Sequence, residues 1–165
     1  MVKTENKAEL RKVKIARNMS EETTAFTADL WFNGELIGYC KNSGLGGATF
    51  VTPAFGRNPV STAAITAAHT KVHAFESWCE TLPPDVSKYG TLNMDSDLYL
   101  GLLVDEFENT KWFRRKCRKK TLGILAGAGE GEFVEWNRPY TPEFAAMLRE
   151  KEGDKLVEII NERFL

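Results

Sequence analysis

The chain has 165 residues, a length typical of one domain. Its hydrophobic fraction of 42% is enough for a packed core, which excludes a chain that is disordered throughout. The 22 Lys and Arg nearly balance the 23 Asp and Glu, which excludes a uniformly basic nucleic-acid coat and an acidic DNA mimic. No apolar run approaches the roughly 18 residues of a membrane span, and Met1 to Arg17 lack the apolar core of a secretion signal. We therefore expect a cytoplasmic protein with no membrane partner.

The three cysteines, Cys40, Cys79 and Cys117, are widely spaced and form no C-x-x-C pair. This spacing excludes a zinc ribbon and a thioredoxin-type redox site. We interpret the three as reduced, partly buried thiols.

The N-terminal third is rich in strand patterns. Residues 1–10 are charged and predicted to form a flexible arm, and residues 11–165 a single α+β domain. Residues 12–17 alternate polar and apolar side chains, as strands do. A clearer strand covers residues 23–32, with one face formed by Phe26, Ala28, Leu30 and Phe32.

Asn33-Gly34 predicts a tight hairpin turn, because both central residues of a type I′ turn need positive φ. The return strand covers residues 35–41, and a short fourth strand covers residues 48–52. The first third is therefore predicted to be an antiparallel meander of three or four strands. A two-residue turn predicts the pairs Leu30–Ile37, Ala28–Tyr39 and Trp31–Leu36.

Two long helices are predicted next. Asn58 and Pro59 are typical of a helix start, and Pro83-Pro84 ends the helix. Its apolar stripe is Ile65, Ala68, Val72, Phe75, Cys79 and Leu82. After a loop to Asn93, a second helix starts near Asp95 or Ser96 and runs to about Lys119. Its broad apolar face is Leu98, Tyr99, Leu102, Leu103, Phe107 and Phe113.

The C-terminal part combines a hairpin with helices. Residues 121–126 and 132–137 are predicted to pair, and Thr141-Pro142 begins a short helix that Gly153 ends. Asp154 is predicted to cap a last helix. The expected fold class is α+β: an antiparallel β-meander packed against two long helices, with a second short hairpin and a helical C-terminal tail. The apolar side of the last helix is Leu156, Val157, Ile160 and Phe164.

The glycine-rich segment Gly44-Leu45-Gly46-Gly47 matches neither of the common phosphate-loop motifs, and a β-rich stretch follows it rather than a helix. A turn or bulge explains it. The alternative is an anion-binding nest formed by the amides of Gly44, Gly46 and Gly47.

His69 and His73 are the only histidines, and they lie four residues apart on one helix. Such a pair can bind one metal ion, but Thr70 replaces the Glu of the H-E-x-x-H motif. We predict that the pair binds no metal and that the chain needs no cofactor. No G-x-S-x-G elbow occurs either, so no catalytic residue is predicted.

A basic tract at residues 111–120 is the sharpest feature of the sequence. Helical spacing aligns Lys111, Arg115 and Lys119 in one ridge, with Arg114 and Arg118 beside it. Such a ridge suits a nucleic-acid backbone or an acidic partner, and the alternative is a solvated helix end. The tract has seven cations: Lys111, Arg114, Arg115, Lys116, Arg118, Lys119 and Lys120.

The opening of the chain carries a distinctive series of short patterns: Ser20-Glu21-Glu22-Thr23, Phe26–Leu30, Asn33-Gly34, Ile37-Gly38 and Asn42-x-Gly44-x-Gly46-Gly47. This series resembles a small uncharacterised family from bacteriophages and other bacterial mobile elements. With Lys119–Leu122, Gly153-Asp154 and 158–162, the similar residues cover about half of the chain. The family pattern has a His between the loop glycines and a Cys after them, where this chain has Leu45 and Ala48.

Three hypotheses about function remain open. The resemblance implies a phage or mobile-element setting, in which a small non-enzymatic binding module modulates a host protein in the host cytoplasm or binds a small anionic ligand. The basic helix end at 111–120 favours a nucleic-acid-binding accessory protein. The third hypothesis is an enzyme whose site lies near Gly44–Gly47.

Overall fold

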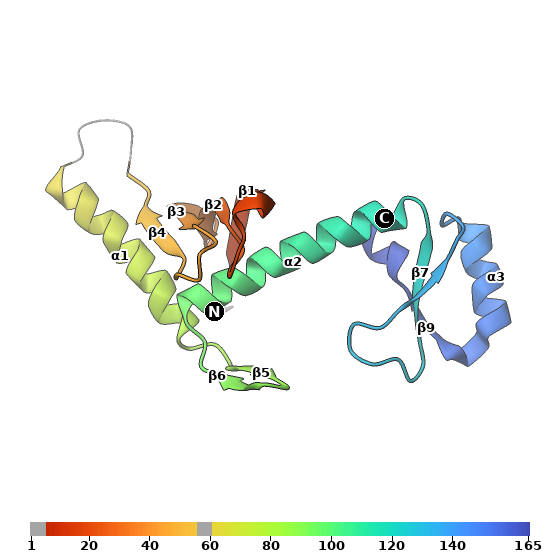
Figure 1. The fold of residues 1–165 in the computed structure, drawn as a ribbon. Helices are drawn as coiled ribbons and strands as arrows, with labels where there is room; N and C mark the ends of the chain where they lie inside the picture. Colours follow the sequence, from red (N-terminus) through yellow and green to blue (C-terminus); the bar gives the residue numbers. More distant parts are fainter. Residues whose placement is uncertain (1–5, 56–60) are drawn as a thin grey trace, which may run out of the picture. The chain divides into compact units, whose positions relative to one another are not determined.

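The computed structural model describes residues 6–55 and 61–165 (Figure 1). The expected α+β class is confirmed within these ranges, which hold a four-stranded antiparallel meander, three α-helices and a second small sheet. The chain divides into two compact units, Met1–Asp105 and Glu106–Leu165, and helix α2 (Ser96–Cys117) contributes residues to both. Among the described helices, none is long and apolar enough to cross a membrane.

The meander of unit 1 follows chain order. Its strands are β1 (Ala8–Ile15), β2 (Phe26–Phe32), β3 (Glu35–Asn42) and β4 (Phe50–Pro53), with the short 3-10 helix η1 (Arg17–Met19) after β1. Residues 8–10, which the sequence analysis placed in the arm, belong to β1 and pair with β2. The predicted alternation along β2 is confirmed, because the buried positions are Phe26, Ala28, Leu30 and Phe32.

The predicted turn between β2 and β3 is confirmed. Asn33 has a φ of 52° and Gly34 a φ of 80°, as a type I′ turn requires. Next to the turn, Trp31 pairs with Leu36 as predicted.

A β-bulge then shifts the register by one residue. The extra residue is Ile37, which is buried with the core. Gly38 fits beyond it because a Cβ there would lie 2.9 Å from the Thr52 carbonyl oxygen. The predicted pairs Leu30–Ile37 and Ala28–Tyr39 are therefore wrong, and the observed pairs are Leu30–Gly38, Asp29–Tyr39 and Ala28–Cys40.

Helix α1 (Thr62–Cys79) packs against β3 and β4 (Figure 1). Its N-cap is Ser61, whose hydroxyl oxygen accepts a hydrogen bond from the Ala64 amide at 3.2 Å. The predicted start at Asn58 and Pro59 lies outside the described residues. Ile65 is 39% exposed and Leu82 lies beyond the helix, so the core stripe is Ala68, Val72, Phe75 and Cys79.

The first part of α2 completes the core of unit 1. Asp95 caps the helix by accepting a hydrogen bond from the Leu98 amide at 2.8 Å. Leu100 and Val104 are buried with the sheet, whereas Leu102 is 38% exposed. The predicted apolar face of α2 is thus only partly right, because nearly every position from 98 to 104 is apolar and periodicity does not select one stripe.

Two short strands replace the loop expected between the long helices. They are β5 (Asp85–Ser87) and β6 (Gly90–Leu92), which pair as an antiparallel ribbon. Each has only three residues, too few for strand alternation to show in the sequence.

Unit 2 is built on a second antiparallel sheet. Strand β7 (Thr121–Leu125) lies between β8 (Val134–Trp136) and β9 (Leu156–Ile159). The predicted β7–β8 hairpin is confirmed, and so is the helix after Thr141, α3 (Pro142–Glu152). Gly153, with a φ of 54°, ends α3. The buried face of this helix is formed by Phe144, Ala145 and Leu148.

The predicted last helix is wrong. After the 3-10 turn η2 (Gly153–Lys155), residues 156–159 form strand β9, and only a 3-10 helix, η3 (Ile160–Phe164), follows. Over so few residues, a helical pattern and an alternating one coincide. Pairing with β7 decides the outcome, since β9 satisfies the second edge of that strand.

Buried Asn161 joins the end of α2 to β7. Its Oδ1 accepts a hydrogen bond from the Leu122 amide at 2.8 Å. Its Nδ2 donates to the carbonyl oxygens of Cys117 at 3.1 Å and Lys120 at 2.9 Å. These carbonyls lie at a helix end, where backbone acceptors lack helical partners.

We expect Asn161→Ala to destabilise unit 2 by on the order of 1–3 kcal/mol, because buried backbone groups lose their partners. Hydrogen exchange followed by mass spectrometry measures this as faster exchange in β7 peptides. The exposed Asn137→Ala is the matched control and leaves these rates unchanged. Equal β7 protection in both variants would contradict the role given to Asn161.

Candidate polyanion-binding site

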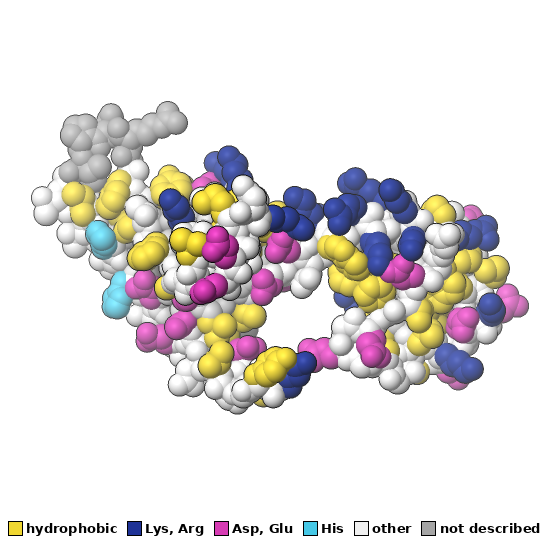
Figure 2. All heavy atoms as spheres, in the orientation of Figure 1, with side chains coloured by type: hydrophobic (Ala, Val, Ile, Leu, Met, Phe, Trp, Pro, Cys, Tyr) yellow, Lys and Arg dark blue, Asp and Glu magenta, His cyan; other side chains and the backbone are white. Residues whose placement is uncertain are grey.

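Lys and Arg side chains gather over the C-terminal part of α2 (Figure 2). The last turn of the helix carries Arg114, Arg115 and Lys116. Cations at this end interact favourably with the helix dipole. The dipole explains why the helix tolerates them but not why there are so many.

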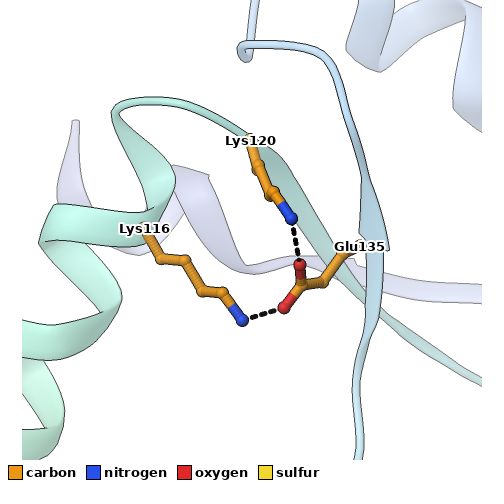
Figure 3. Close-up of polar contacts among 3 residues, drawn as sticks. All are labelled: Lys116, Lys120 and Glu135. Atoms are coloured by element: carbon orange, nitrogen blue, oxygen red, sulfur yellow. Dashed lines mark hydrogen bonds and ion pairs between the residues drawn. The ribbon is translucent and has the colours of Figure 1, made fainter.

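One carboxylate forms ion pairs with two of the seven cations. Glu135 on β8 accepts the ammonium groups of Lys116 and Lys120, one on each oxygen, and the Lys120 contact is 2.7 Å (Figure 3). The Lys116 Nζ also lies 4.4 Å from the ring centroid of Trp112 and 5.3 Å from that of Phe133. These two lysines therefore hold the end of α2 against β8.

The remaining five cations are exposed, and within residues 6–55 and 61–165 none of them forms an ion pair with a carboxylate. Arg114 is the only one of them with an aromatic contact there, 5.7 Å from the ring centroid of Phe164. We call this set the basic cluster: Lys111, Arg114, Arg115, Arg118 and Lys119.

The predicted ridge is helical over only part of its length. Lys111 and Arg115 lie one turn apart on α2, which ends at Cys117. Lys119 lies in the turn that follows, where its amide donates to the Lys116 carbonyl oxygen at 3.0 Å. The structure thus keeps Lys119 near the helix end but not on a helical extension.

Arg114 and Arg118 line an open pocket of about 390 Å³. The Tyr140 hydroxyl, also in its lining, donates to Glu162 at 3.1 Å, and Glu162 accepts Arg149 on both oxygens at 2.7 Å. Burial and this bond to Glu162 raise the pKa of Tyr140, so the phenol stays protonated at neutral pH. The two guanidinium groups are therefore the cationic donors that the pocket offers to an anion.

The glycine-rich loop of unit 1 is held by internal hydrogen bonds. The Oδ1 of buried Asn42 accepts a hydrogen bond from the Gly44 amide at 2.8 Å. The Oγ1 of Thr23 accepts one from the Gly46 amide at 3.3 Å. The Glu22 carboxylate lies against Gly46. Two of the three amides of the possible anion nest, at Gly44, Gly46 and Gly47, are thus already used, and an acid lies beside them.

A second open pocket of about 280 Å³ borders this loop. Asp97 lines it and accepts the Thr49 amide on Oδ1 at 2.7 Å. Asp105 also lines it, whereas no His, Cys, Lys or Arg occurs among its described lining residues. The chemistry beside the loop is therefore acidic and unsuited to an anion.

The histidine pair lies on the exposed side of α1. His73 Nδ1 is 3.7 Å from the Glu76 carboxylate, and the rings of His69 and Phe55 are 6.0 Å apart. Within the described part of the chain, no three His, Cys, Asp or Glu side chains come close enough to hold a metal ion. The absence of metal at His69 and His73 stays a prediction.

The cysteines are free thiols, with Cys40 and Cys79 buried and Cys117 half-buried. Burial raises the pKa of Cys40 and of Cys79 to about 12, and it raises that of Cys117 as well. Since the thiolate is the nucleophile, these thiols are poor ones at neutral pH.

The sequence predicts the cations but not the two residues that bind the end of α2, Glu135 and Asn161. Glu135 and Asn161 lie at least fifteen residues from their partners at the end of α2 and in the turn after it, and neither belongs to a motif. Only the pairing of β8 and β9 with β7 brings them there.

No family model, curated protein or solved structure matches the chain. The resemblance to a phage or mobile-element family therefore stays an expectation from the sequence.

We expect Gly44→Ala to lower the free energy of unfolding by at least about 1–2 kcal/mol, since Gly44 has a φ of 84°. A Cβ there would also overlap the Met19 carbonyl oxygen. Gly47→Ala, with nothing near its Cβ, is the control and changes stability by less than about 0.5 kcal/mol. Urea denaturation measures the free energy of unfolding of both variants. Equal midpoints would refute the argument that the loop needs a glycine at position 44.

At pH 7 the native protein should show no thiol that reacts rapidly with Ellman's reagent. The raised pKa values keep the thiols protonated, and the thiolate fraction grows only as the pH rises towards about 12. All three cysteines should react after denaturation, and Cys117 should react before the other two in the native state. Rapid native labelling that disappears in Cys40→Ser or Cys79→Ser would contradict this expectation.

Proposed function

We propose that the protein is a non-enzymatic binding protein that holds the phosphate backbone of a nucleic acid through the basic cluster. One observation supports the proposal most. Five exposed cations fall within nine residues without a carboxylate partner in the described ranges, although the whole chain has a net charge of −1.

Coulomb repulsion favours an anionic occupant. Lys111 and Arg115 lie about 6 Å apart along the helix axis. Like charges four residues apart on a helix destabilise it by on the order of 0.2–0.5 kcal/mol. Bound phosphates remove this repulsion and release their condensed counterions.

The residue types favour phosphate over a carboxylate partner. Arg114, Arg115 and Arg118 make up most of the basic cluster, and a guanidinium binds phosphate through two parallel hydrogen bonds. Trp112, 37% exposed beside Lys111, adds an aromatic face next to the cations. An acidic protein partner is the competing occupant.

A binding role also suits the reactive groups of the chain. Burial holds Cys40 and Cys79 in their unreactive form. The cations that face the second unit's pocket are arginines, which stay protonated and do not exchange protons in catalysis. The groups in this region are suited to holding charge rather than to proton transfer.

Charge reversal in Arg115→Glu/Lys119→Glu should weaken binding to a short labelled DNA by about tenfold or more at low salt. Fluorescence anisotropy measures this across about 50 to 200 mM salt. The slope of log K against log salt should fall by about 2, one unit for each lost phosphate contact. The fold should persist, since exposed charges contribute only about 0–1 kcal/mol.

The control is Lys151→Glu/Lys155→Glu, which makes the same change of net charge at exposed positions of unit 2. It should bind DNA like the wild type. Equal DNA affinity of the basic-cluster variant and the wild type at low salt would refute the proposal. Preference for polyglutamate over DNA at equal charge would assign the cluster to an acidic protein instead.

A further inference from the structure

The outward face of the meander in unit 1 is open to solvent. Side chains alternate between the two faces of a sheet, so the register of the four strands defines which of them share a face. Two rows cross β1 to β4 on the side away from the core: Lys14–Thr27–Lys41–Phe50, and Arg11–Asp29–Tyr39–Thr52. Except for half-buried Asp29, all of these positions are exposed.

Two exposed aromatic rings stand on this face. Phe50 is 74% exposed and Tyr39 is 44% exposed. Phe50 pairs with Lys41 and Tyr39 with Thr52, so the rings are diagonal neighbours on adjacent strands. Diagonal neighbours lie about 7–8 Å apart, within reach of aromatic side chains. Exposing a large aromatic ring to water is unfavourable. We call the two adjacent rings of Tyr39 and Phe50 the platform.

The charges on the same face leave a positive surplus. The acids are already paired, Glu9 with Arg11 at 2.8 Å and Asp29 with Lys12 at 3.1 Å. Lys14 and Lys41 flank Thr27 in one row, and neither forms an ion pair with a described residue. Two uncompensated cations therefore lie in line with the Phe50 ring.

We propose that this face binds single-stranded nucleic acid, with bases stacked on Tyr39 and Phe50 and phosphates held by Lys14 and Lys41. Base stacking on aromatic side chains needs no sequence recognition, because every base has a flat face. A duplex keeps its bases stacked internally, so only a single strand can use the platform. The inference rests on the proposed function for its ligand class but uses other residues, in unit 1.

A protein occupant fits this face less well. The centres of protein interfaces are depleted in lysine and other charged residues. Here Lys41 lies directly opposite Phe50, and Lys14 and the two ion pairs occupy the β1–β2 side of the same face. Alternating cations and aromatic rings are instead what single-strand binding grooves combine.

The test compares Tyr39→Ala/Phe50→Ala with the wild type, using anisotropy of a labelled thymidine homopolymer and of a mixed-sequence duplex. The variant should bind the single strand about thirtyfold more weakly or worse, since two stacked bases are lost. Its duplex affinity and its salt slope should not change. Lys14→Ala/Lys41→Ala should instead lower the single-strand salt slope by about 1.4.

Two further variants separate stacking from nonspecific effects. Val86→Ala/Tyr89→Ala removes comparably exposed apolar surface from the β5–β6 ribbon and should leave single-strand affinity unchanged. Tyr39→Trp/Phe50→Trp keeps two ring faces and should preserve binding.

The outcomes distinguish this inference from the proposed function. If Arg115→Glu/Lys119→Glu weakens binding while Tyr39→Ala/Phe50→Ala binds the single strand normally, only the platform is refuted. A wild-type protein that binds neither nucleic acid refutes both. A wild-type dimer that Tyr39→Ala/Phe50→Ala converts to a monomer refutes the platform and makes the face an interface between copies.

Discussion

The positive-φ turn at Asn33–Gly34 is the constraint on which unit 1 depends, because it sets which side chains enter the core. Strand side chains alternate, so a slip of one residue would exchange the two faces of the hairpin. The bulge at Ile37 produces one such one-residue shift within β3. It adds Ile37 to the core, and the side chains from Gly38 onward alternate again. The same shift turns Tyr39 and Lys41 outward. The core and the proposed platform are thus two results of one register.

Charge pairing plays the corresponding part in unit 2. Exposed ion pairs contribute only about 0–1 kcal/mol each, so the Glu135 contacts do not by themselves hold the unit together. Their effect is to divide seven neighbouring cations into two kinds. Lys116 and Lys120 are committed to Glu135, and Asn161 ties the backbone of the same turn to β7. These contacts tie the turn that carries Arg118 and Lys119 to β7 and β8, and ordering of this kind would lower the entropy cost of the proposed binding.

Local patterns in the sequence predicted the elements that local physics decides. The I′ turn, the buried face of β2, the stripe from Ala68 to Cys79 and the cap at Thr141 all follow from turn chemistry, periodicity and capping. Tertiary contacts decided the rest. Strand β9 forms because β7 has a free edge, and the register past Ile37 depends on a bulge. The ion pairs of Lys116 and Lys120 depend on Glu135, which lies on another strand. The cations of the candidate site could be predicted from the run of Lys and Arg at residues 111–120, whereas the outward aromatic residues could be identified only from the strand register.

The two proposed surfaces use different interactions, so their contributions to binding should depend differently on salt concentration. Phosphate contacts by the basic cluster weaken steeply with salt, because they depend on counterion release. Stacking on Tyr39 and Phe50 depends on ring faces and apolar burial, which salt screens little. The two proposals together imply that the basic cluster contributes most of the affinity for a nucleic acid at low ionic strength. They also imply that the share of the platform, and with it a preference for single strands, grows at higher ionic strength. A chain of nearly zero net charge can in this way bind a polyanion locally without attracting it everywhere on its surface.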